Sequence, residues 1–480
     1  MQSIFWHDYE TFGANPQKDR PCQFAGVRTD LDLNIIEEPV TFYCKPSEDF
    51  LPSPEACLIT GITPQVAMRE GEVEALFAEK INHIFSVPGT CVAGYNSIRF
   101  DDEVSRNLFY RNFIDPYERE WKSGNSRWDI IDVVRLVYVM KPDTLNWPLN
   151  DDGSVSFRLE LLTKENGIEH LSAHDAMSDV YATIELARLV KQRQPKLFDW
   201  VFMMRDKNKI NDMFDFDTHK PLLHVSSKYR ASSGCCALVA PLFRHPSNKN
   251  GVVVWDLRQD LSLWQGESVE EIRDRLYMSG DELGEQGVRP GLKTVHINKC
   301  PIVLPASSIQ SIAAERLNAW GVDMGSVTDN LAYLRSNPDL VSRLAQVFID
   351  ESRPVVNDPD LMIYSGGFFS ASDKAVMSRV RNAGLQELSE GEFLFSDGRL
   401  AEMLFRYKAR SYPQSLTPEE QERWQQHCYE RIISTDSVYM NIEQYAESLR
   451  QLSASASLTA GQQFILEELQ CYAESIIPYV

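Results

Sequence analysis

The sequence predicts three domains: an α/β domain over residues 1–193, a small β-rich domain over 194–350 and a helical domain over 351–480. Strand-like and helix-like segments alternate in the first region, which is typical of a layered α/β domain. The second region contains a β-hairpin signature, and the third contains long helical patterns. A chain of 480 residues also favours about three domains on length alone.

Strands open the first region. Residues 3–11 begin with an apolar, β-favouring run at 4–6, which predicts a buried strand. Residues 22–29 and 39–44 are expected to form a meander with it, and 90–96 predict a fourth strand.

Helices are predicted between and after these strands, over 73–85, 100–109, 158–166 and 173–192. The first of them has an expected inward face formed by Leu76, Ile81, Ile84 and Phe85. The last has an expected inward stripe formed by Ala176, Val180, Ile184, Ala187 and Val190. The apolar segment 130–140 fits either a helix or a buried strand, because periodicity alone does not separate the two.

Beyond Gln194 the pattern changes. Residues 237–257 contain two apolar runs around a turn sequence starting at Pro246, which predicts a hairpin. Strand character at 294–304 and a helix at 269–277 complete a small β-barrel. In the third region, long helical patterns cover 371–384, 416–433 and 460–476.

The net charge of −21 argues at first against nucleic acid as a partner. The excess of acids is uneven, however: twelve in 1–193, one in 194–350 and eight in 351–480. Residues 218–255 contain five basic residues and no acid, and 286–314 contain three and no acid. A globally acidic protein can therefore still present a basic track to a polyanionic substrate.

The composition predicts a cytoplasmic protein. No stretch approaches about 18 uninterrupted apolar residues, so no transmembrane helix is expected. The sequence shows no basic segment followed by an apolar core, so no secretory signal is expected either. Nine scattered cysteines without a paired CxxC framework predict reduced thiols.

Two carboxylates lie at the end of the first predicted strand. Because alternate residues of a strand share a face, Asp8 and Glu10 are expected side by side. Adjacent acids repel each other unless they are neutralised, and Mg²⁺ prefers carboxylate oxygens. Taken alone, the pair favours a solvated strand end over a metal site, because charged pairs are common on surfaces.

Three further residues make the pair a candidate metal site. Asp101 follows the fourth strand at a strand-to-helix corner, although an acid there also suits a first helical turn. His174 stands at the start of the last helix, and Asp179 follows about one and a half turns later. The ordered set within one α/β domain predicts a catalytic metal centre.

This set resembles the DEDDh exonuclease superfamily, whose fold is ribonuclease H-like. Longer segments resemble bacterial exonuclease I: HDYETFG at 7–13, YNSIRFDDE at 95–103, NSRWD at 125–129, NGIEH at 166–170, AHDAMSDVYAT at 173–183 and VHINKCP at 295–301. The resemblance covers nearly the whole chain, although the helical third is less familiar residue by residue. It implies an SH3-like middle domain that contacts DNA, followed by an α-helical C-terminal domain.

The resemblance also implies a two-metal mechanism. Asp8, Glu10 and Asp179 would hold one Mg²⁺ with the attacking water, and Asp8 and Asp101 a second Mg²⁺ at the leaving 3′-oxygen. His174, with an ordinary pKa of about 6.5, would take the proton from the water. Mn²⁺ is expected to substitute for Mg²⁺.

Aromatic and basic residues interleave between 99 and 135. Bases stack on aromatic rings and cations neutralise phosphates, so the tract suits a single strand. The candidates are Arg106, Arg111, Tyr117, Trp121, Lys122, Arg127, Trp128 and Arg135. An equally weighted alternative places both tryptophans in the core and pairs the arginines with neighbouring acids.

Further substrate contacts are expected outside this tract. Glu10 and Phe157 are candidates, and the family places an arginine like Arg158 against the substrate phosphate. The track would continue over the middle domain through Lys207, Lys220, Lys228, Arg230, Lys293, His296 and Lys299.

The leading prediction is an exodeoxyribonuclease that processively hydrolyses single-stranded DNA from the 3′ end, releasing 5′-mononucleotides in repair and recombination. RNA-trimming enzymes such as ribonuclease T and oligoribonuclease share the chemistry but are short, single-domain chains. A non-catalytic nucleic-acid-binding scaffold would be favoured only if the metal carboxylates were replaced. The family implies a monomer that binds single-stranded DNA and the acidic tail of the single-stranded DNA-binding protein.

Overall fold

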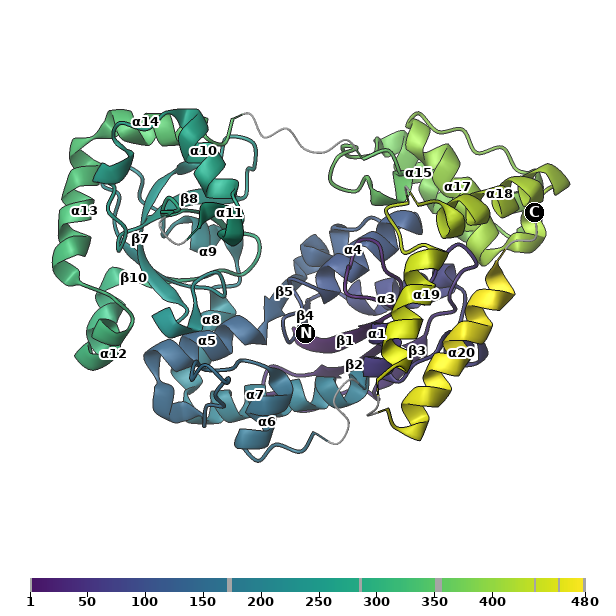
Figure 1. The fold of residues 1–480 in the computed structure, drawn as a ribbon, viewed down its shortest axis with the longest axis horizontal. Coiled ribbons are helices and arrows are strands. Elements are labelled where there is room, and N and C mark those ends of the chain that lie inside the picture. Colours follow the sequence, from purple (N-terminus) through teal and green to yellow (C-terminus); the bar gives the residue numbers. More distant parts are fainter. Residues whose placement is uncertain are drawn as a thin grey trace. The chain divides into compact units, whose positions relative to one another are not determined.

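The computed structural model describes residues 2–170, 175–284, 287–349, 356–435, 437–455 and 458–477. Its contacts divide the chain into two compact units (Figure 1). The first unit contains residues 1–126, 170–184 and 355–480, and the second contains 127–169 and 185–354. The helical C-terminal region therefore belongs to the same unit as the N-terminal strands.

A five-stranded sheet carries the N-terminal strands in the order β3-β2-β1-β4-β5. Its strands are β1 (Ser3–Thr11), β2 (Pro21–Thr29), β3 (Val40–Tyr43), β4 (Thr90–Gly94) and β5 (Ser126–Asp129). β1 runs antiparallel to β2 and parallel to β4. The predicted meander and fourth strand are confirmed.

The same stretch of the chain also forms the helices α1 (Pro54–Thr60), α2 (Pro64–Glu70), α3 (Glu74–Phe85), α4 (Asp101–Arg111), α5 (Ile130–Met140), α6 (Leu159–Glu165) and α7 (Ala176–Arg193), of which α5 and α6 belong to the second unit. The ambiguous segment 130–140 is the helix α5, and the Asp129 carboxylate caps it by accepting the Ile131 N–H at 3.1 Å. The predicted inward stripe of α7 is buried along its whole length.

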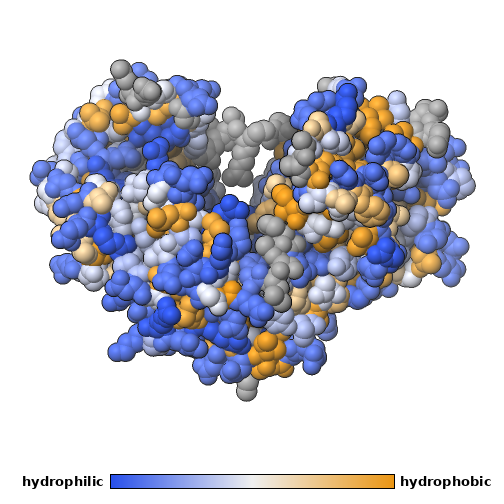
Figure 2. Space-filling view, turned by 60° about the horizontal axis from the view of Figure 1, so that its bottom comes forward, coloured by the Kyte–Doolittle hydropathy of each residue, from blue (hydrophilic) through white to orange (hydrophobic). Residues whose placement is uncertain are grey.

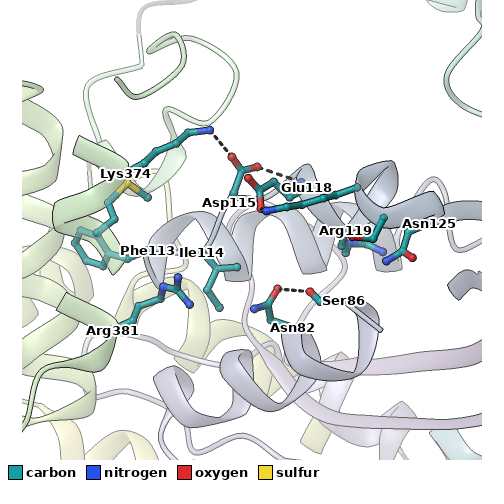
Figure 3. Close-up of a pocket in the computed structure, with 13 residues that line it drawn as sticks. Asn82, Ser86, Phe113, Ile114, Asp115, Glu118, Arg119, Asn125, Lys374 and Arg381 are labelled. Carbon is teal, nitrogen blue, oxygen red and sulfur yellow. Dashed lines mark hydrogen bonds and ion pairs between the residues drawn. The ribbon is translucent and has the colours of Figure 1, made fainter. Parts of the chain in front are cut away.

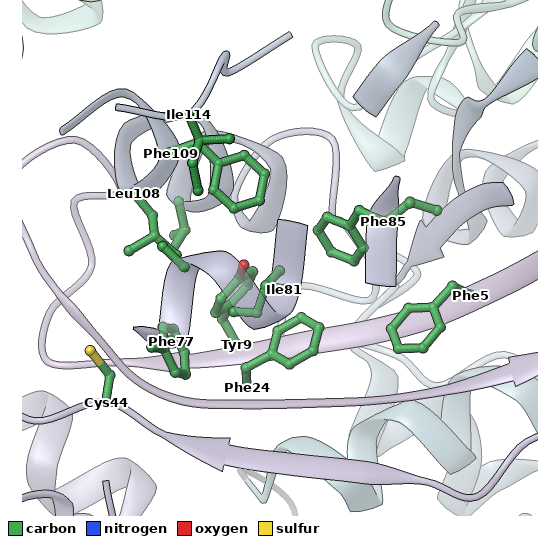
Figure 4. Close-up of a cluster of buried hydrophobic side chains, with 13 residues drawn as sticks. Phe5, Tyr9, Phe24, Cys44, Phe77, Ile81, Phe85, Leu108, Phe109 and Ile114 are labelled. Carbon is green, nitrogen blue, oxygen red and sulfur yellow. The ribbon is translucent and has the colours of Figure 1, made fainter. Parts of the chain in front are cut away.

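An aromatic core joins the sheet to α3 and α4 (Figure 4). Phe5 and Phe24 from the strands lie 6.0 and 5.8 Å, between ring centroids, from Phe85 of α3. Leu76, predicted to face this core, is 48% exposed, whereas its neighbour Phe77 is buried. The prediction for Leu76 is wrong because the larger aromatic side chain one position later faces the core.

The second unit contains an antiparallel sheet in the order β10-β6-β7-β8-β9. Its strands are β6 (Leu222–Val225), β7 (Cys236–Arg244), β8 (Gly251–Asp256), β9 (Leu292–His296) and β10 (Ile302–Pro305). The predicted hairpin is β7 and β8. The strand character predicted at 294–304 corresponds to β9 and β10, between which the chain turns at Cys300, whose φ is +45°.

Helices complete this unit: α8 (Pro195–Met203), α9 (Lys207–Asn211), α10 (Val269–Tyr277), α11 (Gly280–Leu283), α12 (Ala314–Ala319), α13 (Met324–Ser336) and α14 (Pro338–Gln346). The predicted helix at 269–277 is confirmed as α10. It begins with a capping box in which Ser268 and Glu271 each accept the other's backbone N–H.

The C-terminal helices are α15 (Ala371–Asn382), α16 (Leu385–Glu390), α17 (Gly398–Ser411), α18 (Pro418–Ile433), α19 (Ile442–Ser453) and α20 (Ala460–Ile476). They share apolar cores with the N-terminal region. Phe12 and Leu51 belong to one buried cluster with Tyr445 and Leu469. The predicted helical character of this region is confirmed.

Hydrophilic residues predominate on the face shown in Figure 2, where apolar residues are scattered. Across the described ranges, no helix has both the length and the apolar character needed to cross a membrane. Seven of the nine cysteines are buried, and none of the nine, all of which are described, is in a disulfide.

Candidate active site

The carboxyl end of β1 brings carboxylates from two elements together. One oxygen each from Asp8, Glu10 and Asp179 lies within 4.8 Å of the others. Asp8 and Glu10 alternate along β1, and Asp179 lies in the first turn of α7. Asp179 therefore forms one cluster with two acids that precede it by 169 residues or more.

Asp101 lies beside this cluster as the first residue of α4. Its side chain is buried, and its Oδ1 accepts the backbone N–H of Tyr9 at 3.1 Å, between the two acids of β1. Its charge raises the pKa of both Asp8 and Glu10. The four predicted metal ligands thus share one electrostatic environment.

Burial and mutual repulsion control the protonation of the cluster. Burial raises the pKa of Asp8 well above its ordinary value, and the charges of Asp101, Glu10 and Asp179 raise it further. Burial also raises the pKa of Glu10 to about 8, with further contributions from Asp179 and Asp101. A divalent cation cancels this repulsion, and carboxylate oxygens are its preferred ligands, so the residues fit a hard divalent metal.

His170 also contacts the cluster, although it is not among the predicted site residues. Its Nε2 lies 2.5 Å from Asp179 Oδ1, and its side chain is 6% exposed. Asp175 is a second such residue, because its charge raises the pKa of Asp8 and Glu10. The segments NGIEH and AHDAM contained both residues, but sequence spacing did not show which side chains face Asp179.

His174, the predicted general base, lies outside the described residues, so its role stays a prediction. His170 contacts Asp179, and the backbone carbonyl of Asp175 accepts the Asp179 N–H at 3.1 Å.

Two predicted substrate arginines are held in buried ion pairs. The Arg106 guanidinium donates to both carboxylate oxygens of Glu120, at 2.7 and 3.0 Å, and to Glu103 at 2.9 Å. Arg111 pairs with Glu74 at 2.8 Å. Both side chains are at most 5% exposed, and this geometry favours the structural alternative over a phosphate contact.

The tryptophans of the same tract differ from each other. Trp128 is 1% exposed and belongs to the core, whereas Trp121 is 66% exposed and remains a candidate for base stacking. Arg135 is buried, pairs with Asp132 at 2.6 Å and lies 5.5 Å from the Phe157 ring centroid. For Trp128 and Arg135 the geometry again favours a structural role.

The remaining predicted contacts vary in exposure. Arg158 is exposed and pairs with Glu160 at 2.6 Å. The exposed lysines and arginine of the predicted track are Lys207, Lys220, Lys228 and Arg230. The half-buried residues of this track are Lys293, His296 and Lys299, and the separate candidate Phe157 is also half-buried. Lys293 places its Nζ 4.0 Å from the Tyr229 ring centroid, so its cation stabilises the middle domain.

A cavity of ≈ 270 Å³ lies elsewhere in the first unit (Figure 3). It is lined by the end of α3, the segment after α4 and α15. Lys374 and Asp115 form an ion pair of 2.6 Å on its lining. None of the clustered carboxylates lines this cavity, so it is separate from the candidate active site.

Family models match three consecutive segments of the chain. A model described as Exonuclease matches residues 5–187, the Exonuclease I SH3-like domain matches 205–350, and the Exonuclease I C-terminal domain matches 357–476. The expected order of an α/β exonuclease domain, an SH3-like domain and a helical C-terminal domain is confirmed.

Curated relatives and solved structures are similar over almost the whole chain. Exodeoxyribonuclease I of Escherichia coli (strain K12) is 46% identical over 480 residues, 99% of each chain, and that of Haemophilus influenzae is 49% identical over 90% of each. E. coli exonuclease I in complex with a dA16 oligonucleotide matches with a TM-score of 0.93 at 44% identity, covering 99% of this chain and 100% of that chain. The zinc-bound form of the E. coli complex with single-stranded DNA matches with the same TM-score and coverage at 43% identity.

Proposed function

Because the chain belongs to the exonuclease I family, we propose that its carboxylate cluster hydrolyses single-stranded DNA processively from the 3′ end and releases 5′-mononucleotides. The convergence of Asp8, Glu10 and Asp179 within 4.8 Å supports this assignment. The enzyme is an exodeoxyribonuclease, and we place it in DNA repair and recombination.

The activity of this family depends on a divalent metal. We assign Asp8, Glu10 and Asp179 to one Mg²⁺ and Asp8 with Asp101 to a second, with Mn²⁺ as a substitute. When bound, such cations lower the pKa of water and stabilise charge on a leaving oxygen. The buried carboxylates, whose pKa values are raised in the metal-free protein, supply the oxygen ligands.

The chain's own groups position the ligands and move the proton. The Tyr9 N–H orients Asp101 between the two acids of β1. His170 holds Asp179 through its Nε2. His174 is assigned as the base that removes the proton from the attacking water, since an imidazole changes charge near neutral pH.

One assay tests the proposal directly. End-labelled single-stranded DNA, duplex DNA and RNA are incubated with the protein, with and without Mg²⁺. We expect stepwise loss of 3′ nucleotides from single-stranded DNA only when Mg²⁺ is present. Equal cleavage of RNA would move the assignment toward an RNA-trimming enzyme.

A ligand variant with a matched control tests the site. Asp179→Asn should reduce turnover below about 1% of wild type, because it removes a shared metal ligand. Glu185→Gln changes an exposed carboxylate on the same helix, and its activity should match wild type. Substantial turnover by Asp179→Asn would remove this residue from the metal set.

We further propose that the enzyme is a cytoplasmic monomer that binds the acidic tail of the single-stranded DNA-binding protein. Support comes from the acid-free stretch 218–255, where Lys220, Lys228 and Arg230 are exposed. Cations of this kind form charge-assisted hydrogen bonds with a carboxylate-rich peptide. Titration of a labelled tail peptide at low salt checks the interaction, and absence of saturable binding would contradict it.

A further inference from the structure

A turn in the C-terminal domain holds one phenylalanine out in solvent. Phe368 is 87% exposed, whereas the next residue, Phe369, stacks on Tyr110 with ring centroids 5.7 Å apart. Burial of a phenylalanine stabilises a fold, and Phe368 does not contribute this stabilisation. Phe368 faces solvent while its neighbour Phe369 is packed, so the backbone conformation of the turn determines which of the two rings is exposed.

The turn is fixed by Arg399. Its Nη2 donates to the Gly367 carbonyl at 3.1 Å, and its guanidinium lies 4.5 Å from the Phe369 ring centroid. At Gly366 a Cβ atom would lie 1.7 Å from Arg399 Nη1, and Gly367 has a φ of +75°. The positive φ favours glycine at 367, and a side chain at 366 would displace the end of Arg399, so the exposure of Phe368 follows from this turn.

The same turn is attached to the helix that carries a predicted metal ligand. The Tyr364 hydroxyl donates to the Glu103 carboxylate and accepts from Arg106 Nη1 at 3.2 Å. Glu103 lies two residues after Asp101 on α4. At about 1.5 Å rise per residue, Arg106 is about 8 Å along α4 from Asp101.

Phe368 forms an aromatic surface with Tyr117. The two rings pack edge to face, with centroids 6.0 Å apart, and the Arg106 guanidinium lies 5.4 Å from the Tyr117 centroid. Arg106 pairs with both Glu103 and Glu120, and Lys374 pairs with Asp115. Each of these carboxylates is therefore in an ion pair, which reduces its repulsion of a phosphate backbone.

We propose that Phe368, supported by Tyr117, is a base-stacking subsite for the DNA strand upstream of the 3′ end that is cleaved. This inference rests on the proposed function. Every base has a π-face, so an exposed ring on a rigid turn binds single strands without sequence preference. The turn that carries Phe368 contacts α4, which bears Asp101. A base stacked on this ring would therefore keep the strand near the active site after each nucleotide is released.

The test measures stacking separately from hydrolysis. Oligonucleotides carrying 2-aminopurine at successive positions from the 3′ end are titrated with the protein in EDTA. We expect one position to show strong quenching with wild type, weak quenching with Phe368→Ala and Phe368→Leu, and restored quenching with Phe368→Tyr. Affinity should fall roughly 5- to 150-fold in Phe368→Ala.

Leu394→Ala is the matched control, because Leu394 is a 77% exposed apolar residue of the same C-terminal domain. Its quenching and affinity should equal those of wild type. If Phe368→Ala shows wild-type quenching and affinity, the stacking subsite is wrong while the nuclease assignment stands. If wild type with Mg²⁺ leaves single-stranded DNA intact, the proposed function itself fails.

Discussion

At the scale of single residues, burial and proximity act together on the active-site carboxylates. Asp8 and Glu10 share a face of β1, and Asp101 and Asp179 approach from two helices. Burial disfavours each negative charge, and the neighbouring charges add to that effect. The folded, metal-free protein therefore holds protons that the unfolded chain releases near pH 4.

The pH dependence of stability follows from this difference. The pKa of Glu10 is about 8 in the folded protein and ordinarily 4.5, so its contribution is fully present below pH 4.5 and is lost as pH rises through 8. We expect the free energy of unfolding in EDTA to decrease from pH 5 to pH 8. Urea denaturation across this range measures it.

Glu10→Gln provides the comparison, because a neutral amide at this position does not titrate. Its stability should depend less on pH than that of wild type. Addition of a divalent cation at pH 8 should raise wild-type stability more than that of Glu10→Gln. Parallel pH profiles for the two proteins would contradict the assignment.

A second residue-scale prediction concerns His174. His174→Ala should lower turnover by roughly 10²- to 10⁴-fold, because the attacking water loses its base. Affinity for single-stranded DNA should stay near wild type. Single-turnover rates and binding in EDTA measure the two effects separately, and an equal loss of binding would indicate a structural role.

At the scale of elements, α17 connects the C-terminal domain to the N-terminal region through buried charges. Arg410 Nη2 lies 2.7 Å from Asp49 Oδ2 and 2.7 Å from Asp360 Oδ2. Burial acts to raise the pKa of Asp49, but Arg410 and Arg431 outweigh it and hold this pKa well below its ordinary value. Both carboxylates therefore stay charged inside the protein.

Removal of the central cation should destabilise the fold. Arg410→Met leaves Asp49 and Asp360 buried with weaker compensation, and we expect the free energy of unfolding to fall by about 3–5 kcal/mol. Arg423→Met on α18 removes a 55% exposed arginine and should cost no more than about 1 kcal/mol. If urea denaturation shows similar losses of unfolding free energy for both variants, the buried ion pairs of Arg410 have no special role in stability.

At the scale of the whole molecule, the predicted exonuclease domain shares apolar cores with the C-terminal helices. Phe12 and Leu51 share a core with Tyr445 and Leu469, and Phe113 packs edge to face on Tyr407 at 5.3 Å. A fragment of residues 1–193 contains all five predicted catalytic residues but lacks these partners. The C-terminal helices therefore contribute to folding of the unit that contains the active site.

We expect the 1–193 fragment to bind hydrophobic dyes and to lack a cooperative thermal transition, because its apolar surface loses its cover. The full-length protein is the control. Circular dichroism and dye fluorescence check the prediction, and a monomeric fragment that unfolds cooperatively would contradict it.

The middle domain should determine run length. Lys220→Glu combined with Lys228→Glu reverses two exposed cations in the acid-free stretch 218–255, so phosphate contacts and their counterion release are lost. Runs on a long strand should shorten in a trap-challenged digestion, while single-turnover cleavage of a very short oligonucleotide stays unchanged. Lys196→Glu, an exposed lysine outside the stretch, is the control, and equal run lengths would show that the strand does not contact this face.

The sequence by itself determined the local elements and the set of candidate catalytic residues. The apolar, β-favouring run at 4–6 predicted the first strand, and the apolar stripe of 173–192 predicted the last helix, because such patterns are local. The spacing of Asp8, Glu10, Asp101, His174 and Asp179 was sufficient for the family resemblance. These signals are local or consist of ordered motifs, so they can be read without knowledge of packing.

Only the tertiary structure decided which side chains serve the fold and which face a substrate. Arg106 and Trp128 have the chemistry of strand-binding residues, but ion pairs and core packing hold them, whereas Trp121 and Phe368 are exposed. His170 Nε2 lies 2.5 Å from Asp179 Oδ1, a contact that no spacing in the sequence predicted. The shared core of the N-terminal strands and the C-terminal helices joins residues about 400 positions apart, and burial of this kind depends on the whole chain rather than on any local pattern.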